Sequence, residues 1–209
     1  MSSAILQCEQ LYSERDDRVL FADLSFSLAA GEILQIAGPN GAGKTSLLRI
    51  LAGLSSRFEG ELRWRGQSML HNCAQFHRET HYLGHGAGLK AVLSPLENLR
   101  WSCALRGVSQ ADEAIFGALD KVGLSGYEYH PCLALSAGQQ RRVNLARLFC
   151  SSAALWILDE PFTAIDQKGV AEIESWLAEF KTAGGMVLLT SHQPLSPSLG
   201  ANVIDLGAH

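Results

Sequence analysis

One short stretch constrains this chain more than any other feature of its sequence. It fits the pattern G-x-x-x-x-G-K-[ST] and consists of Gly38, Pro39, Asn40, Gly41, Ala42, Gly43, Lys44 and Thr45. Its glycines let the backbone curl so that successive N–H groups point at phosphate oxygens. The pattern assigns the β- and γ-phosphates to the Lys44 ammonium and Mg²⁺ to the Thr45 hydroxyl.

The residues on either side of this loop support a nucleotide site. An apolar run at 33–37 predicts a buried strand before it, and 46–52 predicts a helix that Gly53 ends. Such a helix directs the positive end of its dipole at the bound anion. We therefore expect the loop, together with Ser46, to bind a nucleoside triphosphate.

Composition places limits on the class of protein. The 209 residues suffice for one domain, and 47% hydrophobic residues fit a globular α/β protein. A net charge of −4 argues against a nucleic-acid partner, since no basic excess neutralises phosphates. The five cysteines include no C-x-x-C pair, which indicates reduced thiols in the cytosol. No signal peptide or long apolar run is evident, so we expect a soluble chain.

Hydrophobic periodicity predicts mixed strands and helices with one helical insertion. Residues 4–30 resemble an antiparallel hairpin, further strands are expected at 61–66 and 81–84, and 67–80 shows no clear period. From Ser94 the pattern is helical to 135, with breaks near Gly107 and Gly123, and a long helix opens at Ser136. The remaining expected elements are strands at 154–158 and 186–190 and a helix at 167–182.

Two acidic residues follow the apolar strand at 154–158. In doubly wound sheets, ligands bind at the carboxyl ends of strands. Asp159 there would hold Mg²⁺ directly or through water, and Glu160 would polarise the water that attacks the γ-phosphate. An ordinary acidic loop is the alternative, and the phosphate-binding loop upstream weighs against it.

A second glycine-containing motif, L-S-x-G-Q, occupies 135–139. A serine and small residues at a helix N-terminus make an anion site, although Ser136 alone reads equally well as a simple N-cap. The order along the chain favours the functional interpretation: phosphate-binding loop, L-S-x-G-Q, apolar strand with Asp-Glu, and then His192.

This order of motifs resembles ATP-binding cassette (ABC) nucleotide-binding subunits from end to end. The resemblance places Walker A at 38–45, the signature at 135–139, Walker B at 155–160, the D-loop at 163–166 and the switch histidine at His192. It implies one domain, 1–209, in the P-loop NTPase α/β fold. A RecA-like core at about 1–84 and 141–209, with an antiparallel β subdomain, would carry a helical subdomain at about 85–140.

The family resemblance also implies ligands and partners. ATP with Mg²⁺ would lie between two copies of the chain, held by Walker A of one and by the signature of the other. The residues implied at this interface are Ser136, Gly138, Gln139 and Asp166. Glu160 and His192 would be catalytic, and integral membrane transporter subunits would bind the dimer.

Three positions depart from the family pattern. His85 stands where a lid glutamine is expected, and its imidazole can hold a metal-bound water or a hydrogen bond. Ala137 replaces a glycine of the signature, and Ala tolerates positive φ less well. The aromatic residue that stacks on adenine aligns with Arg15, whose guanidinium can stack on a base, and Tyr12 is the alternative.

His77, His81 and His85 are spaced i, i+4, i+8, which on one helix would make a metal-binding face. Because 82–84 is typical of a strand and turn, we do not expect that face to form. His85 therefore stays a candidate for the nucleotide site, as a catalytic or metal-associated residue.

Particular stretches narrow the family further. Residues 14–18, 84–90 and 96–99 resemble the ATP-binding subunit of the bacterial cytochrome c maturation system, a haem exporter. That subfamily implies a peripheral protein on the cytoplasmic face of the inner membrane, where ATP hydrolysis drives haem handling or release of a haem-loaded chaperone. The alternatives are an ABC ATPase for another exported substrate, a soluble ABC ATPase acting on ribosomes or chromosomes, and a non-hydrolysing nucleotide-binding module. Glu160 argues against the last of these.

Overall fold

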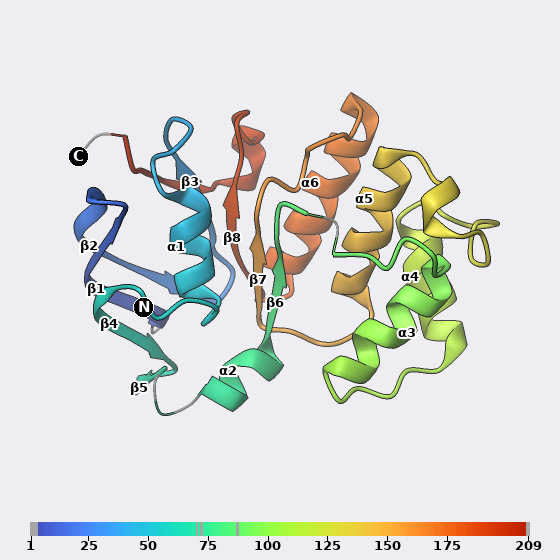
Figure 1. Cartoon of the computed structure of the whole chain (residues 1–209), viewed down its shortest axis with the longest axis horizontal. Coiled ribbons are helices and arrows are strands. Elements are labelled where there is room, and N and C mark those ends of the chain that lie inside the picture. The colour runs from blue at the N-terminus through green and yellow to red at the C-terminus, as the bar shows by residue number, and fades with distance from the viewer. Residues whose placement is uncertain (1–3, 70, 72, 87, 208–209) are drawn as a thin grey trace.

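A four-stranded antiparallel sheet forms one end of the molecule, as the computed structural model shows (Figure 1). The structure describes residues 4–69, 71, 73–86 and 88–207. The order of the strands in this sheet is β2-β1-β4-β5. Their bounds are β1 Ala4–Arg15, β2 Arg18–Ala29, β4 Glu59–Trp64 and β5 Gln67–Ser68. The hairpin predicted for the first thirty residues is confirmed, with Leu24 and Leu28 buried and the serines between them exposed.

A five-stranded parallel sheet with the order β6-β7-β8-β3-β9 forms the centre of the fold. Its strands are β3 Ile33–Ala37, β6 Thr80–Leu83, β7 Leu155–Leu158, β8 Met186–Thr190 and β9 Asn202–Asp205. Because every pair is parallel, the carboxyl ends of all these strands lie at one edge. The loops that follow β3, β6, β7 and β8 therefore meet there.

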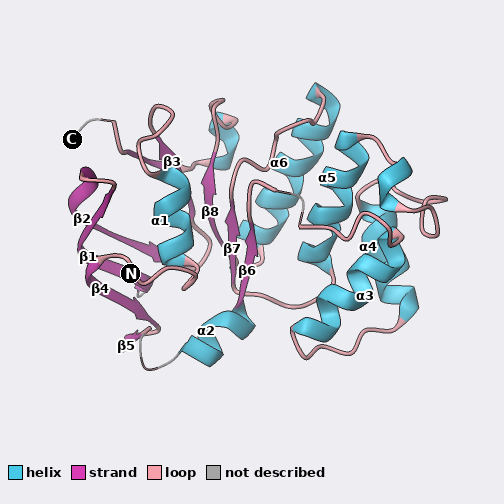
Figure 2. Ribbon diagram, viewed as in Figure 1, coloured by secondary structure: helices cyan, strands magenta, loops and turns pink. Residues whose placement is uncertain are grey.

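The described residues form six α-helices (Figure 2). They are α1 Lys44–Leu51, α2 Cys73–Glu79, α3 Pro95–Leu105, α4 Asp112–Lys121, α5 Ala137–Ala146 and α6 Gln167–Thr182. Short 3₁₀ turns lie at 132–134, 147–149 and 197–199. Capping fixes where the helices begin: Ser94 and Ser136 each form a capping box, and Asp166 accepts a hydrogen bond from Gly169 N. Helices α3 and α4 lie at the end of the molecule far from the antiparallel sheet (Figure 1).

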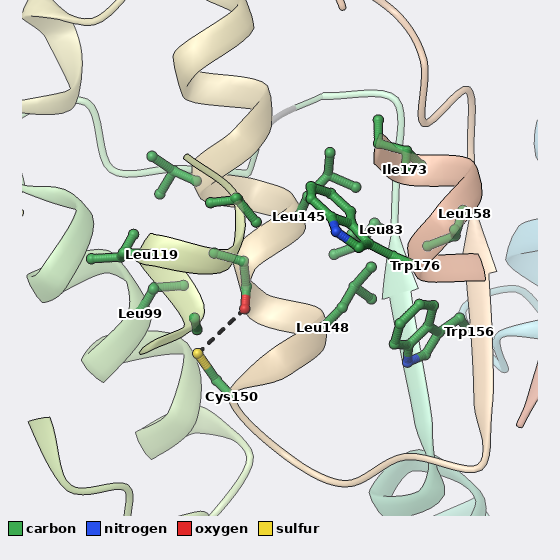
Figure 3. Close-up of a cluster of buried hydrophobic side chains, with 14 of the residues drawn as sticks. Leu83, Leu99, Leu119, Leu145, Leu148, Cys150, Trp156, Leu158, Ile173 and Trp176 are labelled. Carbon is green, nitrogen blue, oxygen red and sulfur yellow. Dashed lines mark hydrogen bonds between the residues drawn. The ribbon is translucent and has the colours of Figure 1, made fainter. Parts of the chain in front are cut away.

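Alternation along the parallel strands produces two cores. Leu34, Ile36 and Leu188 belong to the core shared with α1 and the antiparallel sheet. Ile33 and Leu189, one residue away on the same strands, belong to the core shared with α3 to α6. Successive side chains of a strand point to opposite faces, so the central sheet is buried on both sides. Figure 3 shows the second core, whose members come from the sheet and from the surrounding helices.

Among the α-helices and strands, three were not predicted from the sequence, α2, β5 and β9. The helical pattern expected to reach 135 was wrong beyond Gly123, where the only helical segment before 135 among the described residues is the 3₁₀ turn at 132–134. Helix α2 buries only Phe76, so it carries no apolar period that a sequence pattern reveals. Strand β9 lies at the sheet edge and is mostly exposed, which removes the usual hydrophobic signal. Helix α1 begins at Lys44, earlier than expected, and α6 has the predicted bounds. Among the helices of the described residues, none has both the length and the apolar character needed to cross a bilayer.

Candidate functional site

The phosphate-binding loop joins β3 to α1 and needs glycine at specific positions. Gly38, Gly41 and Gly43 have φ of 134°, 81° and 96°, a region that L side chains rarely adopt. A Cβ on Gly43 would also lie 2.9 Å from Leu20 Cβ, closer than real Cβ contacts. Both the conformation and the contact with the antiparallel sheet therefore require glycine at position 43.

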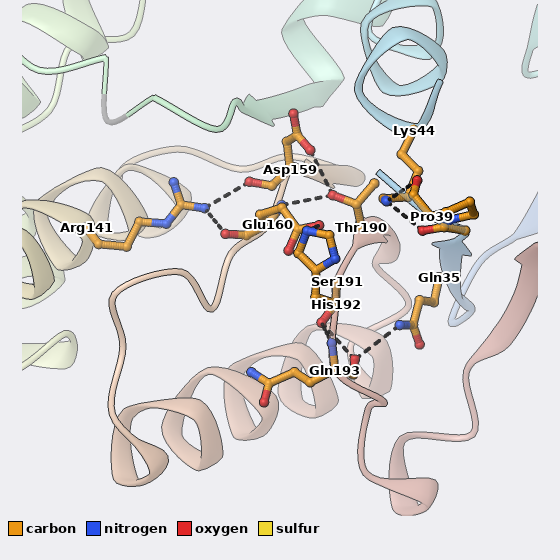
Figure 4. Close-up of polar contacts among 11 residues, drawn as sticks. Gln35, Pro39, Lys44, Arg141, Asp159, Glu160, Thr190, Ser191, His192 and Gln193 are labelled. Atoms are coloured by element: carbon orange, nitrogen blue, oxygen red, sulfur yellow. Dashed lines mark hydrogen bonds and ion pairs between the residues drawn. The ribbon is translucent and has the colours of Figure 1, made fainter. Parts of the chain in front are cut away.

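Lys44 lies across its own loop. Its Nζ donates to the carbonyl oxygens of Gly38 at 2.7 Å and Pro39 at 3.1 Å (Figure 4). The side chain is buried, and none of its hydrogen bonds within the described residues goes to a carboxylate. The ammonium is thus held in the loop without an acidic partner, which leaves its charge available for an anion.

A cavity of about 410 Å³ lies at the carboxyl edge of the parallel sheet. Its lining residues come from the β1–β2 hairpin, the phosphate-binding loop, the start of α1 and the loops after β6, β7 and β8. They are Arg15, Leu20, Asn40, Gly41, Gly43, Lys44, Thr45, Ser46, His85, Glu160 and His192. The fold therefore brings together candidates that lie far apart in the sequence.

Asp159 and Glu160 follow β7, and both are anchored to Thr190 at the end of β8. Thr190 Oγ1 donates to Asp159 Oδ1 at 2.8 Å and accepts from Glu160 N at 2.9 Å (Figure 4). Asp159 Oδ2 and Glu160 Oε1 are buried, and neither has a hydrogen-bond partner among the residues that the structure describes. A buried carboxylate oxygen without a donor is the ligand type that Mg²⁺ prefers, so these residues fit a metal ion.

His192, in the loop after β8, lies beside Glu160. The His192 Nε2 atom is 3.5 Å from Glu160 Oε1, and the His192 side chain is 61% exposed while that of Glu160 is 12% exposed. The histidine thus lies between the buried carboxylate and solvent. From there it can orient a group that enters the cavity.

Arg141 in α5 does not line the cavity but donates hydrogen bonds to the Walker B residues Asp159 and Glu160. It is 5% exposed and donates to main-chain carbonyls on two loops, and Figure 4 shows its bonds to Asp159 and Glu160. Burial lowers its pKa, while the nearby charges of Asp159 and Glu160 raise it. The sequence placed Arg141 on a helix but gave no signal of this contact, because its acceptors are carbonyl groups of distant segments.

Comparison with known proteins identifies the family. The family model described as ABC transporter matches residues 21–163, more than half of the chain. The chain belongs to the ABC transporter family. It is an ATPase of the ABC type, it binds ATP, and its family membership implies membrane transporter subunits as partners.

Two relatives are similar over nearly the whole length. The chain is 54% identical over 204 residues to the cytochrome c biogenesis ATP-binding export protein CcmA of Hahella chejuensis, covering 98% of this chain and 96% of that protein. It is 50% identical over 208 residues to the protein of the same name from Pseudomonas fluorescens, covering 99% and 98%.

Solved structures support the fold. An ABC transporter ATP-binding protein from Pyrococcus furiosus matches with a TM-score of 0.84 at 24% identity, covering 98% of each chain. The expected fold class, an α/β ABC nucleotide-binding domain with parallel and antiparallel sheets, is therefore confirmed.

The ABC signature lies outside the cavity of its own chain. Ser136 is the exposed N-cap of α5, and Asp166 is the exposed N-cap of α6. A Cβ on Gly138 would lie 3.0 Å from the Ala164 carbonyl oxygen, so the signature packs against the D-loop stretch. Gln139 completes the capping box of Ser136. None of Ser136, Gly138, Gln139 and Asp166 lines the cavity around Lys44.

Two departures from the family pattern are explained by the geometry. Ala137 is the first residue of α5 and does not adopt positive φ, so its Cβ adds no backbone strain. Arg15 lines both the cavity around Lys44 and a neighbouring hollow at the hairpin, whereas Tyr12 lines only the hollow and donates its hydroxyl proton to Glu14 at 2.8 Å. Of the two candidates for adenine contact, Arg15 has the suitable position.

The three spaced histidines fall in different environments. His77 lies in α2, 3.5 Å from Cys73 Sγ through Nδ1, and His81 is buried in β6, where its Nε2 is 2.8 Å from Ser151 Oγ. His85 is in the loop after β6 and lines the cavity. They do not share one helix face, as expected, and no group of three metal-binding side chains exists among the described residues.

Proposed function

We propose that this protein is the ATP-hydrolysing subunit of a bacterial inner-membrane exporter for cytochrome c maturation. It would couple ATP hydrolysis to haem handling or to release of a haem-loaded chaperone. The observation that carries this proposal is the 54% identity to the Hahella chejuensis export protein over 98% of the chain. The match extends over nearly the whole length of both proteins, which supports the same role for the whole chain.

We assign the chemistry to the residues at the cavity. Glu160 accepts the proton of the attacking water, and His192, 3.5 Å away, orients the γ-phosphate end of the substrate. Lys44 binds the β- and γ-phosphates as a charge-assisted donor. Thr45 and the unpartnered Asp159 Oδ2 would hold Mg²⁺, and His85 lines the same cavity as Thr45. When bound, Mg²⁺ neutralises negative charge on the phosphate oxygens.

Two copies of the chain would complete each ATP site. Ser136 is exposed at the N-terminus of α5, where the helix dipole and free N–H groups favour an anion. Ser136 lines no cavity with Lys44 in its own chain, so its ligand would come from a second copy. A two-fold dimer places the signature of each copy against the phosphate-binding loop of the other.

The remaining assignments concern partners and location. Residues of about 85–140, which hold α3 and α4, would form the helical subdomain that moves against the core at about 1–84 and 141–209. Membrane subunits would bind the dimer on the cytoplasmic face of the inner membrane, where it is peripheral. With a net charge of −4 the chain has no basic excess for nucleic acid.

Complementation tests this function. Deleting the gene from its host should abolish covalent haem in c-type cytochromes, detected by haem staining, and wild-type protein should restore it. Lys44→Ala should fail to restore it, whereas Arg100→Gln should succeed because Arg100 lies in an exposed pair with Asp112 outside the cavity. Normal c-type cytochromes in the deletion strain would show that the exporter serves another substrate.

A further inference from the structure

A single buried guanidinium connects three segments around the candidate catalytic site. Arg141 Nη2 donates to the carbonyl oxygens of Asp159 at 3.0 Å and Glu160 at 2.6 Å. Its Nε donates to Pro161 O at 3.3 Å, and its Nη1 donates to Gly84 O at 3.2 Å. All four acceptors are main-chain carbonyls, so this arginine binds the backbone of loops and not a carboxylate.

The backbone of Glu160 is strained and is fixed on both sides. Its φ is 50°, in the left-handed region that a residue with a Cβ rarely adopts. Its N–H donates to Thr190 Oγ1 at 2.9 Å, and its C=O accepts the 2.6 Å bond from Arg141. Strain of this kind persists only where surrounding contacts over-determine the conformation. Arg141 and Thr190 supply those contacts.

The direction of the Glu160 carboxylate therefore depends on its backbone. Among the described residues Glu160 Oε1 is buried and accepts no hydrogen bond, and His192 Nε2 lies 3.5 Å from it. No hydrogen bond to Oε1 holds the side chain, so the direction of the Cα–Cβ bond determines where the allowed rotamers can place the carboxylate. A rotation of the Glu160 peptide would move this carboxylate relative to the phosphate-binding loop.

The fourth bond of Arg141 reaches the loop that carries His85. Gly84, whose carbonyl accepts from Nη1, directly precedes His85, which lines the same cavity as Glu160. Arg141 itself belongs to α5, the helix that Ser136 caps. The guanidinium thus links the signature helix, the His85 loop and the Glu160 loop. Figure 4 shows its bonds to the carbonyls of Asp159 and Glu160.

Burying an arginine without an ion pair is costly for the fold alone. Taking a charged group out of water is expensive, and burial lowers the Arg141 pKa accordingly. An apolar side chain of similar length would fill the same volume without that cost. The hydrogen bonds from Arg141 to these main-chain carbonyls therefore have a role that apolar packing alone does not fill.

We propose that Arg141 is a positioning residue for ATP hydrolysis. Its hydrogen bonds set the direction of the Glu160 carboxylate, and they make that direction depend on the positions of α5 and the His85 loop. This inference rests on the proposed role of Glu160 as the base. Arg141 touches neither substrate nor metal in this scheme. Its effect on turnover acts through the Glu160 backbone.

Steady-state ATP hydrolysis and ATP binding by the full chain test the proposal. Arg141→Met should lower kcat about 10- to 100-fold, the range expected for a catalytic group displaced by about 1 Å, and leave ATP affinity within about twofold. Arg141→Lys retains a donor and should recover part of that loss. In a Glu160→Gln background, Arg141→Met should cause no further loss, because no carboxylate remains to be positioned.

Arg106 provides a matched control. It is another partly buried arginine whose bonds go to main-chain carbonyls, Thr80 O at 2.9 Å and Arg78 O at 3.0 Å, at the opposite end of β6. Arg106→Met should lower thermal stability without the change in kcat. Wild-type kcat in Arg141→Met, equal losses in both arginine variants, or additive losses with Glu160→Gln would overturn the positioning role. Wild-type turnover in Glu160→Gln alone would instead overturn the role of Glu160.

Discussion

The hydroxyl of Thr190 donates a 2.8 Å hydrogen bond to Oδ1 of Asp159, across two neighbouring parallel strands. Both residues are almost fully buried, at 0% and 1% exposure. This bond occupies one carboxylate oxygen and leaves Oδ2 without a partner among the described residues, so Oδ2 is the oxygen that remains available to a metal ion. The same hydroxyl accepts from Glu160 N, which links the metal-binding and base residues.

Replacing Thr190 with valine tests this link, because valine keeps the shape and removes the hydroxyl. A buried carboxylate oxygen and the Glu160 N–H would both lose their partner, at a cost of about 1–3 kcal/mol in free energy of unfolding. We expect kcat to fall about tenfold or more, since both acidic residues lose their orientation. Thr182→Val, at an exposed residue that donates to Ala178 O in α6, is the control. Unchanged turnover in Thr190→Val would refute the link.

Lys44→Ala should weaken ATP binding about 10- to 100-fold by removing a charge-assisted contact to phosphate. The measurement is equilibrium binding of a fluorescent ATP analogue. Lys168→Ala removes the same charge from a side chain that is 85% exposed and should bind normally. Full nucleotide affinity in Lys44→Ala would contradict the assignment of the phosphate-binding loop.

Much of this fold was predictable because its central strands are buried on both sides. The apolar runs that give β3, β7 and β8 can be recognised without knowing their neighbours in the sheet. Strand β9 escaped prediction because edge position and exposure remove the signal. Helix α2 was not predicted because one buried side chain in seven residues produces no hydrophobic periodicity.

Those residues of the candidate site that belong to sequence motifs could be predicted. Lys44, Glu160 and His192 follow from local patterns and their order, and the fold places all three on one cavity. Arg141 and Thr190 could not be predicted, since their partners depend on tertiary structure: the Gly84 carbonyl is 57 residues from Arg141. Sequence patterns therefore reveal ligand-contacting residues more readily than residues whose role is to hold the backbone of another segment in place.

Glu160→Gln should separate ATP binding from turnover. The amide keeps the size and an acceptor but cannot take a proton, so hydrolysis should fall about 10²-fold or more while ATP binding persists. The variant should accumulate as an ATP-bound dimer, measured by light scattering after gel filtration with Mg²⁺ and ATP. Glu113→Gln, at an exposed position in α4, should stay like the wild type. Only monomer at high protein concentration would count against the composite sites.

His85→Gln and His85→Ala should differ in turnover. His85 lines the cavity with Glu160, and Gly88 in the same loop has φ of 59°, a conformation that suits a hinge. Glutamine retains a hydrogen-bonding group and should keep most activity, whereas alanine should lower kcat about three- to tenfold with ATP affinity unchanged. Equal wild-type turnover in both variants, with and without membrane subunits, would show that His85 is a surface residue.

His81 predicts how stability depends on pH. It is buried in β6 beside Arg106 and Arg147, and burial followed by these two charges lowers its pKa from 6.5 to about 3. Below pH 6.5 the unfolded chain binds a proton at this position that the folded chain does not bind until about pH 3. The free energy of unfolding should therefore fall as pH drops from 6.5 towards 3, by at most about 1.4 kcal/mol per pH unit from this residue.

Urea denaturation at pH 7, 6 and 5 checks this dependence on wild type and His81→Gln. The glutamine can still hydrogen-bond Ser151 Oγ, which is 2.8 Å from His81 Nε2, but it does not titrate. The variant should be less stable than wild type at pH 7, and the difference should shrink as the pH falls because only the wild type loses this contribution. His71→Gln, at an exposed position, should show no such convergence. A stability difference that is constant across the three pH values would mean that His81 titrates alike in the folded and unfolded chain.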